Sequence, residues 1–180
     1  MTYYDELTSA MTWLGSLPGS VFLGQCVRYP GNALFNTLTG VTMDKRIEMG
    51  VCEDMQLGAA IGLAYAGKIP VCIFPRIDFL MCAMNQLANH LDHFPERVII
   101  RTAVGSRRPL DPGPQHSTDY VKALRETLSN TRVIDLTHPS MIRKSYLYAV
   151  GKMKDRIAEE YGSHWIASIL IERADLYGME

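Results

Sequence analysis

The stretch GVCEDMQLGAAIGLAYAGKIPVCIF, residues 50–74, decides the fold because it joins a helix pattern directly to a buried strand pattern. We predict a helix over residues 54–67 and a strand over residues 69–74. Gly58 and Gly62 lie inside this helix, where each glycine costs about 1 kcal/mol relative to alanine. Because small residues let another backbone approach closely, the two glycines indicate tight packing, either within the chain or against a second chain.

Outside this stretch, helix and strand patterns alternate along the chain. Expected helices cover residues 3–15, 79–91, 117–129 and 139–160, and expected strands cover residues 21–25, 46–50, 97–103, 131–136 and 165–172. Strands such as RVIIRTA and WIASILIE are apolar almost throughout, and such strands need cover on both faces. We therefore predict one α/β domain over residues 1–180, a three-layer α/β/α sandwich with a mostly parallel sheet.

Composition narrows the class of partner. The chain has 180 residues, 47% of them hydrophobic, with a formal net charge of -1 and no block of Lys and Arg. Nucleic acids and anionic membranes attract positive surfaces, so this near-neutral charge favours a small molecule or a protein as the partner. No signal peptide and no stretch of about 20 apolar residues is present, so we expect a cytoplasmic protein without a membrane span.

The cysteines and histidines do not form a metal-binding pattern. Cys26, Cys52, Cys72 and Cys82 are scattered through apolar segments, which favours reduced thiols in the core over a disulfide framework. His90 and His93 could share one helix face, but no third ligand has suitable spacing, so we expect no metal site in this chain.

The segment VGSRRPLDPGPQHS, residues 104–117, is the first candidate for a site because it is rich in Pro and Gly and follows a predicted strand. In open α/β sheets, ligands bind beside the carboxyl ends of the strands. Within it, His116 is either a general acid or base or an ordinary loop residue. Arg107 and Arg108 either recognise a carboxylate or phosphate or are solvated loop charges.

Taken together, the spacing of several residues resembles the pyrimidine-binding domain of thiamine-diphosphate-dependent enzymes, closest to the pyruvate dehydrogenase β subunit and transketolase. The matching positions are Glu53, Gly58, Gly62, Gly67, Pro70, Phe79, the segment AMNQLANH and the Gln-His-Ser of residues 115–117. The segments VFLGQCV and ILIERADLYG resemble the first strand and the closing segment of that domain. The resemblance therefore covers nearly the whole chain.

The resemblance implies a role for each candidate residue. The Glu53 carboxyl group would hydrogen-bond to the aminopyrimidine ring of the cofactor and promote its shift to the imino form, which activates the thiazolium carbon. Phe79 would line or stack on the pyrimidine, and His116 would lie near the substrate. Gln25 would also lie at the cofactor, although the family commonly has an acid there. We further expect apolar neighbours, Val51, Met55 and Leu57, to bury Glu53.

One element of the family is absent from this sequence. No Gly-Asp-Gly followed by a downstream Asn occurs, and this element holds magnesium and the diphosphate in the family. We therefore expect a small subunit of a split enzyme, assembled as a hetero-oligomer of dimers with a subunit that carries the diphosphate-binding domain. No C-terminal transketolase-type domain is expected in this chain.

The expected reaction is decarboxylation of a 2-oxo acid and transfer of the acyl unit. Ketol transfer between sugars is the alternative reaction, and a non-catalytic binding or regulatory subunit is the alternative outside enzymes. The presence of Glu53 favours catalysis, whereas Gln25 and the missing domain favour the non-catalytic alternative.

Overall fold

A computed structural model describes residues 1–94, 96–105, 111–152 and 167–178 of the chain. Its centre is a six-stranded sheet in which every paired strand is parallel, in the order β2-β1-β3-β4-β6-β5. The strands are β1 (Ser20–Gly24), β2 (Arg46–Glu48), β3 (Ile69–Ile73), β4 (Ile99–Val104), β5 (Arg132–Leu136) and β6 (Ser168–Arg173).

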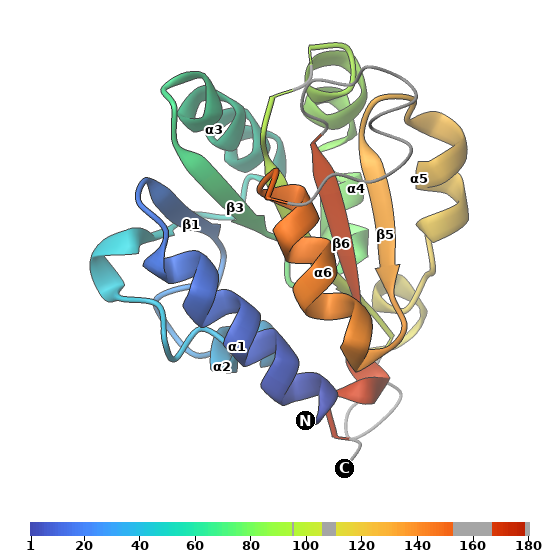
Figure 1. Ribbon diagram of the computed structural model, residues 1–180. Helices are drawn as coiled ribbons and strands as arrows, with labels where there is room; N and C mark the ends of the chain where they lie inside the picture. Colours follow the sequence, from blue (N-terminus) through green and yellow to red (C-terminus); the bar gives the residue numbers. More distant parts are fainter. Residues whose placement is uncertain (95, 106–110, 153–166, 179–180) are drawn as a thin grey trace.

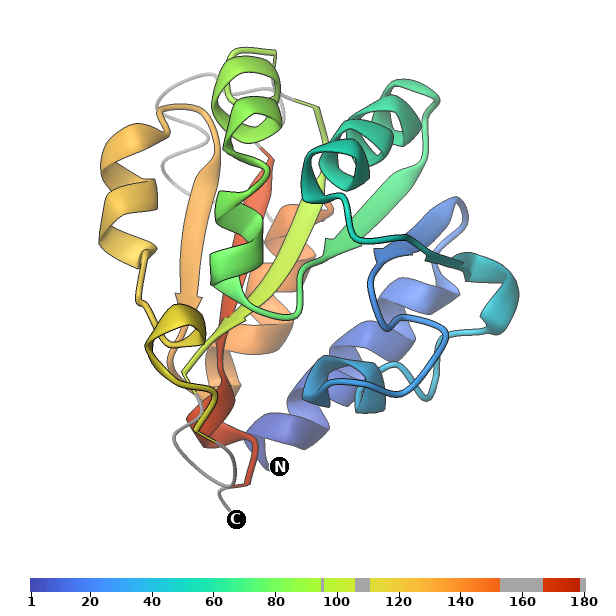
Figure 2. The ribbon, with the colours of Figure 1, turned by 180° about the vertical axis from the view of Figure 1, so that it is seen from behind.

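Helices cover both faces of this sheet (Figures 1 and 2). One face carries α1 (Tyr3–Ser16), α2 (Ala33–Asn36) and α6 (Pro139–Ala149). The other carries α3 (Glu53–Tyr65), α4 (Ile77–Met81), α5 (Val121–Thr127) and the π-helix η2 (Asn85–Leu91). Short 3₁₀ turns complete the chain at η1 (Met43–Lys45), η3 (Pro114–His116) and η4 (Ala174–Leu176). The predicted three-layer α/β/α architecture is confirmed.

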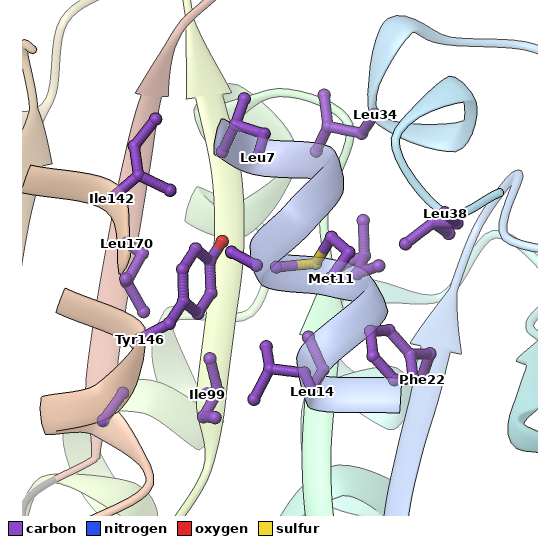
Figure 3. Close-up of a cluster of buried hydrophobic side chains, with 14 of the residues drawn as sticks. Leu7, Met11, Leu14, Phe22, Leu34, Leu38, Ile99, Ile142, Tyr146 and Leu170 are labelled. Atoms are coloured by element: carbon purple, nitrogen blue, oxygen red, sulfur yellow. The ribbon is translucent and has the colours of Figure 1, made fainter. Parts of the chain in front are cut away.

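The core divides into two apolar clusters, one on each face of the sheet, because successive side chains of a strand point to opposite faces. On β4, Ile99 packs with α1 and α6, whereas Ile100 packs with the helices of the opposite layer. Figure 3 shows the first cluster, where Leu14 of α1 and Tyr146 of α6 approach Ile99. The apolar character of β4 in the sequence therefore reflects burial on both sides.

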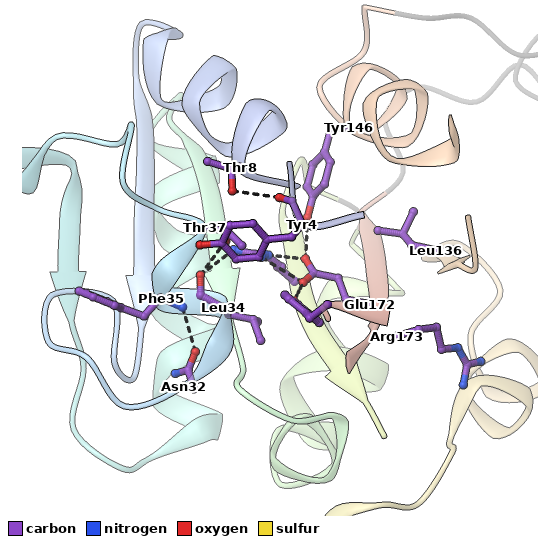
Figure 4. Close-up of polar contacts among 12 residues, drawn as sticks. Tyr4, Thr8, Asn32, Leu34, Phe35, Thr37, Leu136, Tyr146, Glu172 and Arg173 are labelled. Atoms are coloured by element: carbon purple, nitrogen blue, oxygen red, sulfur yellow. Dashed lines mark hydrogen bonds and ion pairs between the residues drawn. The ribbon is translucent and has the colours of Figure 1, made fainter. Parts of the chain in front are cut away.

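A buried polar cluster sits inside the first of these layers. Arg101 and Glu172 form a bidentate ion pair between β4 and β6, and both side chains are fully buried. The hydroxyls of Tyr146 and Tyr177 also donate to the Glu172 carboxylate, as Figure 4 shows for Tyr146. Burial, with the charge of Glu172 adding to it, raises the pKa of both tyrosines well above its ordinary value.

Three expected helices differ from the observed ones. The range 79–91 covers the end of α4 and a separate π-helix, whose residue Gln86 contacts the first turn of α3. The helix expected over residues 117–129 begins at Val121, whose amide donates to Asp119. The helix expected over residues 139–160 ends at Ala149, because Gly151 adopts a positive φ of 75° in a Schellman turn; residues 153–160 lie outside the described part.

The cysteine prediction is partly wrong. All four cysteines are free, but Cys52 and Cys82 are exposed and Cys26 is half-buried, so only Cys72 is a core thiol. No helix in the described ranges is long and apolar enough to cross a membrane.

Candidate functional site

The candidate residues gather at the edge of the sheet where the strands end. Gln25 directly follows β1, and Glu53 begins α3 shortly after β2. Phe79 lies on α4, which follows β3, and His116 lies on η3, which follows β4. Because all strands are parallel and β1 is the neighbour of β3, these four residues share one edge. This is the edge where open α/β sheets bind ligands.

Gln25 and Glu53 are in direct contact. The Gln25 side-chain Nε2 donates a hydrogen bond of 3.1 Å to Oε1 of Glu53. Both side chains are half-buried, and Glu53 occupies the first turn of α3, where the helix dipole favours a negative charge. The amide of Gln25 therefore fixes the orientation of one carboxylate oxygen and leaves the other without a hydrogen bond among the described residues.

The expected apolar enclosure of Glu53 is not found. Leu57 is fully buried, but Val51 is 82% exposed and Met55 is 53% exposed. The reason is that α3 is apolar on all sides, while one side alone packs on the sheet. Glu53 itself is half-buried, and the exposed Val51 and Met55 do not enclose it.

Glu48, at the end of β2, shapes the turn that carries Gln25. Its carboxylate accepts hydrogen bonds from three successive backbone amides, those of Cys26, Val27 and Arg28, at 2.6, 2.9 and 2.8 Å. The turn includes Cys26 in the left-handed region at φ 54°, which is uncommon for a residue other than glycine. The carboxylate thus stabilises a backbone conformation that the chain seldom adopts unaided.

The second acid of the α3 first turn, Asp54, also meets a glutamine. Gln86 of the π-helix donates from Nε2 to Oδ2 of Asp54 at 3.2 Å. A Cβ atom built on Gly58 would lie 3.6 Å from the Gln86 side chain, an ordinary van der Waals distance, so α3 and the π-helix pack against each other at this glycine. A Cβ on Gly62 would meet no atom within 4 Å. Of the two interpretations of the glycines, packing within the chain therefore applies to Gly58 and leaves Gly62 unexplained.

Gly62 belongs to an exposed apolar stripe on α3. Met55, Ala59, Gly62 and Ala66 are all exposed, at spacings of four, three and four residues, which places them along one side of the helix. We call these four residues the α3 stripe. Surface helices of globular proteins normally have polar side chains on the side that faces solvent. The α3 stripe is instead apolar, which is typical of a surface that another chain covers.

Phe79 and His116 form the second pair at this edge. Their rings meet edge to face, with centroids 5.3 Å apart. The Nδ1 atom of His116 is buried and has no hydrogen-bond partner among the described residues. Because buried polar atoms are nearly always paired, this nitrogen is a candidate to meet a bound molecule.

Arg76 connects the loop after β4 to the loop after β3. Its Nη1 donates to the carbonyl oxygens of Gly105, at 3.0 Å, and of His116, at 3.2 Å. One guanidinium group therefore fixes the backbone at the start of the 104–117 segment and again at His116. Arg107 and Arg108 lie outside the described residues.

The sequence did not single out Glu48, Arg76 or Gln86. The first two act on backbone groups, which every residue possesses, so no side-chain pattern signals them. Gln86 was visible within the matching segment AMNQLANH, but its contact with Asp54 is tertiary. In the described ranges, no group of three His, Cys, Asp or Glu residues could hold a metal ion.

Several solved structures share this fold. A split-gene transketolase, described as an inactive β4 tetramer, has a TM-score of 0.70 at 19% identity. The match covers 96% of this chain and 51% of the transketolase chain. Transketolase from Campylobacter jejuni subsp. jejuni has a TM-score of 0.70 at 15% identity, over 96% of this chain and 26% of its own. The 2-oxoglutarate:ferredoxin oxidoreductase from Magnetococcus marinus has a TM-score of 0.61 at 14% identity, and the match covers 98% of this chain and 29% of the oxidoreductase chain.

This chain therefore spans about half the length of the split-gene transketolase chain and less than a third of the other two. No protein-family model and no curated protein matches the sequence. The likeness is one of fold, and it confirms the pyrimidine-binding fold of thiamine-diphosphate enzymes that the sequence resembles.

Proposed function

We propose that this chain is the pyrimidine-binding subunit of a split thiamine-diphosphate-dependent enzyme, a single domain over residues 1–180. The observation that carries the proposal is the Glu53 carboxylate at the start of α3, held by Gln25 at the edge shared with Phe79 and His116. A carboxyl group at this place in this fold is the group that the activation of the cofactor requires.

The side chains fit the pyrimidine half of the cofactor. An aminopyrimidine needs a carboxyl group at one ring nitrogen and an apolar or aromatic neighbour for its ring. Glu53 offers one carboxylate oxygen that accepts no hydrogen bond in the described structure, and Phe79 offers a half-buried ring. Magnesium and the diphosphate would be held by the partner subunit.

The chain's own residues then have distinct tasks. When bound, thiamine diphosphate would supply a nucleophilic carbon and an acceptor for negative charge. Glu53 would hold a proton at its carboxyl group for the pyrimidine nitrogen, and Gln25 would keep that carboxyl group oriented. His116 would offer its Nδ1, which has no hydrogen-bond partner among the described residues, to the substrate as a hydrogen-bond partner or as an acid or base.

A partner subunit completes the site. We propose that a second polypeptide supplies the Gly-Asp-Gly and Asn element in a hetero-oligomer, and the likeness to a split-gene transketolase supports this arrangement. The α3 stripe, on the helix that begins with Glu53, and the exposed Val51 just before that helix support a contact with another chain. An apolar surface beside a half-buried carboxylate is consistent with a cofactor site that closes between subunits.

The substrate we propose is a 2-oxo acid, decarboxylated with transfer of the acyl unit; Arg107 and Arg108 are candidates to bind its carboxylate. Ketol transfer between sugars is the second candidate, because two of the structures compared above are transketolases.

Calorimetry tests the proposal. The full chain is titrated with thiamine diphosphate and magnesium, alone and after mixing with a subunit that co-purifies with it and carries Gly-Asp-Gly. We expect weak binding by the chain alone and tight, magnesium-dependent binding by the mixture. Tight binding by the isolated chain would refute the split site. An assembled complex that binds cofactor but turns over neither 2-oxo acids nor ketoses would identify a non-catalytic subunit instead.

A further inference from the structure

Three successive backbone amides that point at one anion form an anion-binding concavity, which proteins commonly use for phosphate or carboxylate groups. Here the amides of Cys26, Val27 and Arg28 form such a concavity, and the chain fills it with its own Glu48 carboxylate. The concavity is therefore closed to outside anions in this structure.

The contact between Glu48 and the amides of residues 26–28 also fixes the backbone next to Gln25. On one side of it, the carbonyl of Gly24 accepts from the amide of Met49 at 2.8 Å, and Gly24 also pairs with β3. On the other side, the amide of Cys26 donates to Glu48 at 2.6 Å. Gln25 thus lies between two residues whose backbones are both fixed, and its side chain reaches Glu53.

We propose that Glu48 is a positioning residue that holds Gln25 against Glu53. Without the carboxylate, the amides of residues 26–28 lose their acceptor, and the left-handed conformation of Cys26 loses its support. The turn then relaxes, and the Gln25 amide no longer stays within hydrogen-bond distance of Glu53. The geometric part of this inference stands alone, whereas its consequence for turnover rests on the proposed function.

The chain contains a matched control for a purely structural carboxylate. Asp92 accepts from the amides of Ser129, Asn130 and Thr131 at 2.9, 2.8 and 2.7 Å, the same number of contacts as Glu48 makes. It lies at the opposite edge of the sheet, between the π-helix and β4 and against the start of β5. Asp92→Asn therefore removes an equivalent interaction away from the candidate site.

The geometric part is tested by nuclear magnetic resonance on the full isolated chain. In Glu48→Gln, we expect the amides of residues 26–28 to exchange with solvent at least about tenfold faster, because the charged acceptor is lost. We also expect the side-chain amide signal of Gln25 to move toward its position in Glu53→Gln, the variant that changes the contact directly. Asp92→Asn should leave the Gln25 signal in place.

If Glu48→Gln does not fold, Glu48→Asp replaces it, because it keeps the charge and shortens the reach by one methylene group. A Gln25 signal that is unchanged in the folded Glu48 variant would overturn the positioning role, whatever happens to the exchange rates.

The catalytic part is tested by a double-mutant cycle in the assembled enzyme. Glu48→Gln and Gln25→Ala should each lower turnover, and the double variant should be no slower than Gln25→Ala alone, because both act through one contact. Asp92→Asn should lower the unfolding temperature but leave turnover at saturating cofactor unchanged. Additive losses, or wild-type turnover in Glu48→Gln, would overturn the inference. If no assembled complex is active, the proposed function fails, while the Gln25 signal still decides the geometric part.

Discussion

Replacing Gly62 tests whether the α3 stripe is an interface, because substitutions there should affect the stability of the isolated chain and its assembly with a partner differently. A methyl group at this position would meet no atom within 4 Å, so Gly62→Ala adds no clash within the chain. Alanine also removes the helix-interior penalty of glycine, so we expect the free energy of unfolding to rise by about 1 kcal/mol. For a chain of this size, that is a rise in unfolding temperature of about 2–4 °C, measured by scanning calorimetry on the isolated chain.

Assembly should respond in the opposite direction. If a second chain packs against the α3 stripe, Gly62→Leu places a large side chain in a close contact. Overpacking of this kind costs about 1–3 kcal/mol, which is roughly a 5- to 150-fold increase in dissociation constant. The affinity is measured by calorimetric titration with the partner subunit. The isolated Gly62→Leu chain should still fold, because the position is open in the described structure.

Gly58 provides the control. A Cβ there would lie 3.6 Å from the Gln86 side chain, so Gly58→Ala is tolerated, whereas Gly58→Leu displaces Gln86 and destabilises the isolated chain. A Gly62→Leu variant that binds the partner with wild-type affinity would show that the α3 stripe does not form the interface. A Gly62→Ala variant less stable than wild type would show that the helix does not have the open surface described.

Three further predictions concern single side chains. Glu53→Gln keeps the volume and should preserve assembly but reduce turnover by at least about 100-fold, the usual loss when an acid–base group is removed; wild-type rates in the assembled variant would refute the assignment. His116→Ala should lower kcat more than cofactor affinity, and a loss confined to cofactor affinity would make His116 a structural residue. Burial raises the pKa of the Cys72 thiol from 9.0 to about 12. The neutral thiol is therefore favoured in the fold, and its contribution is fully present below pH 9 and lost as the pH rises toward 12. Alkaline denaturation should accordingly be steeper in wild type than in Cys72→Ala, and equal slopes would contradict this.

The strands were readable from the sequence because a buried parallel strand is a continuous apolar run. β3 lies within its expected range, and β4 and β6 each extend one residue beyond the end of theirs. The helices were less readable, because their ends depend on individual backbone contacts. Gly151 ends α6 by adopting a left-handed conformation, and the sequence shows a glycine there without showing which conformation it takes.

The orientation of α3 could not be predicted for a different reason. Leu57, Ala60, Ile61 and Ala64 face the sheet, whereas Met55, Ala59, Gly62 and Ala66 face outward, and both sets are small or apolar. A helix with two apolar sides carries no periodic signal for which side is the core. The expectation that apolar neighbours bury Glu53 was wrong for two of the three residues named, because Val51 and Met55 are exposed and Leu57 alone is buried.

The glutamine at position 25 bears on how a proton would move at the proposed site. The enzymes that the sequence resembles commonly have an acid at this position, which could pass a proton onward, whereas a glutamine amide cannot. In this chain, Gln25 donates to Glu53, and Gln86 donates to Asp54, so neutral amides hold both acids of the α3 first turn. With no ionisable group among the hydrogen-bond partners of Glu53 in the described residues, the proposed function requires that a proton on Glu53 pass to the cofactor ring or to solvent without a relay through another side chain of this chain. If a second chain covers Glu53, as we propose, the ring would be the remaining partner for that proton.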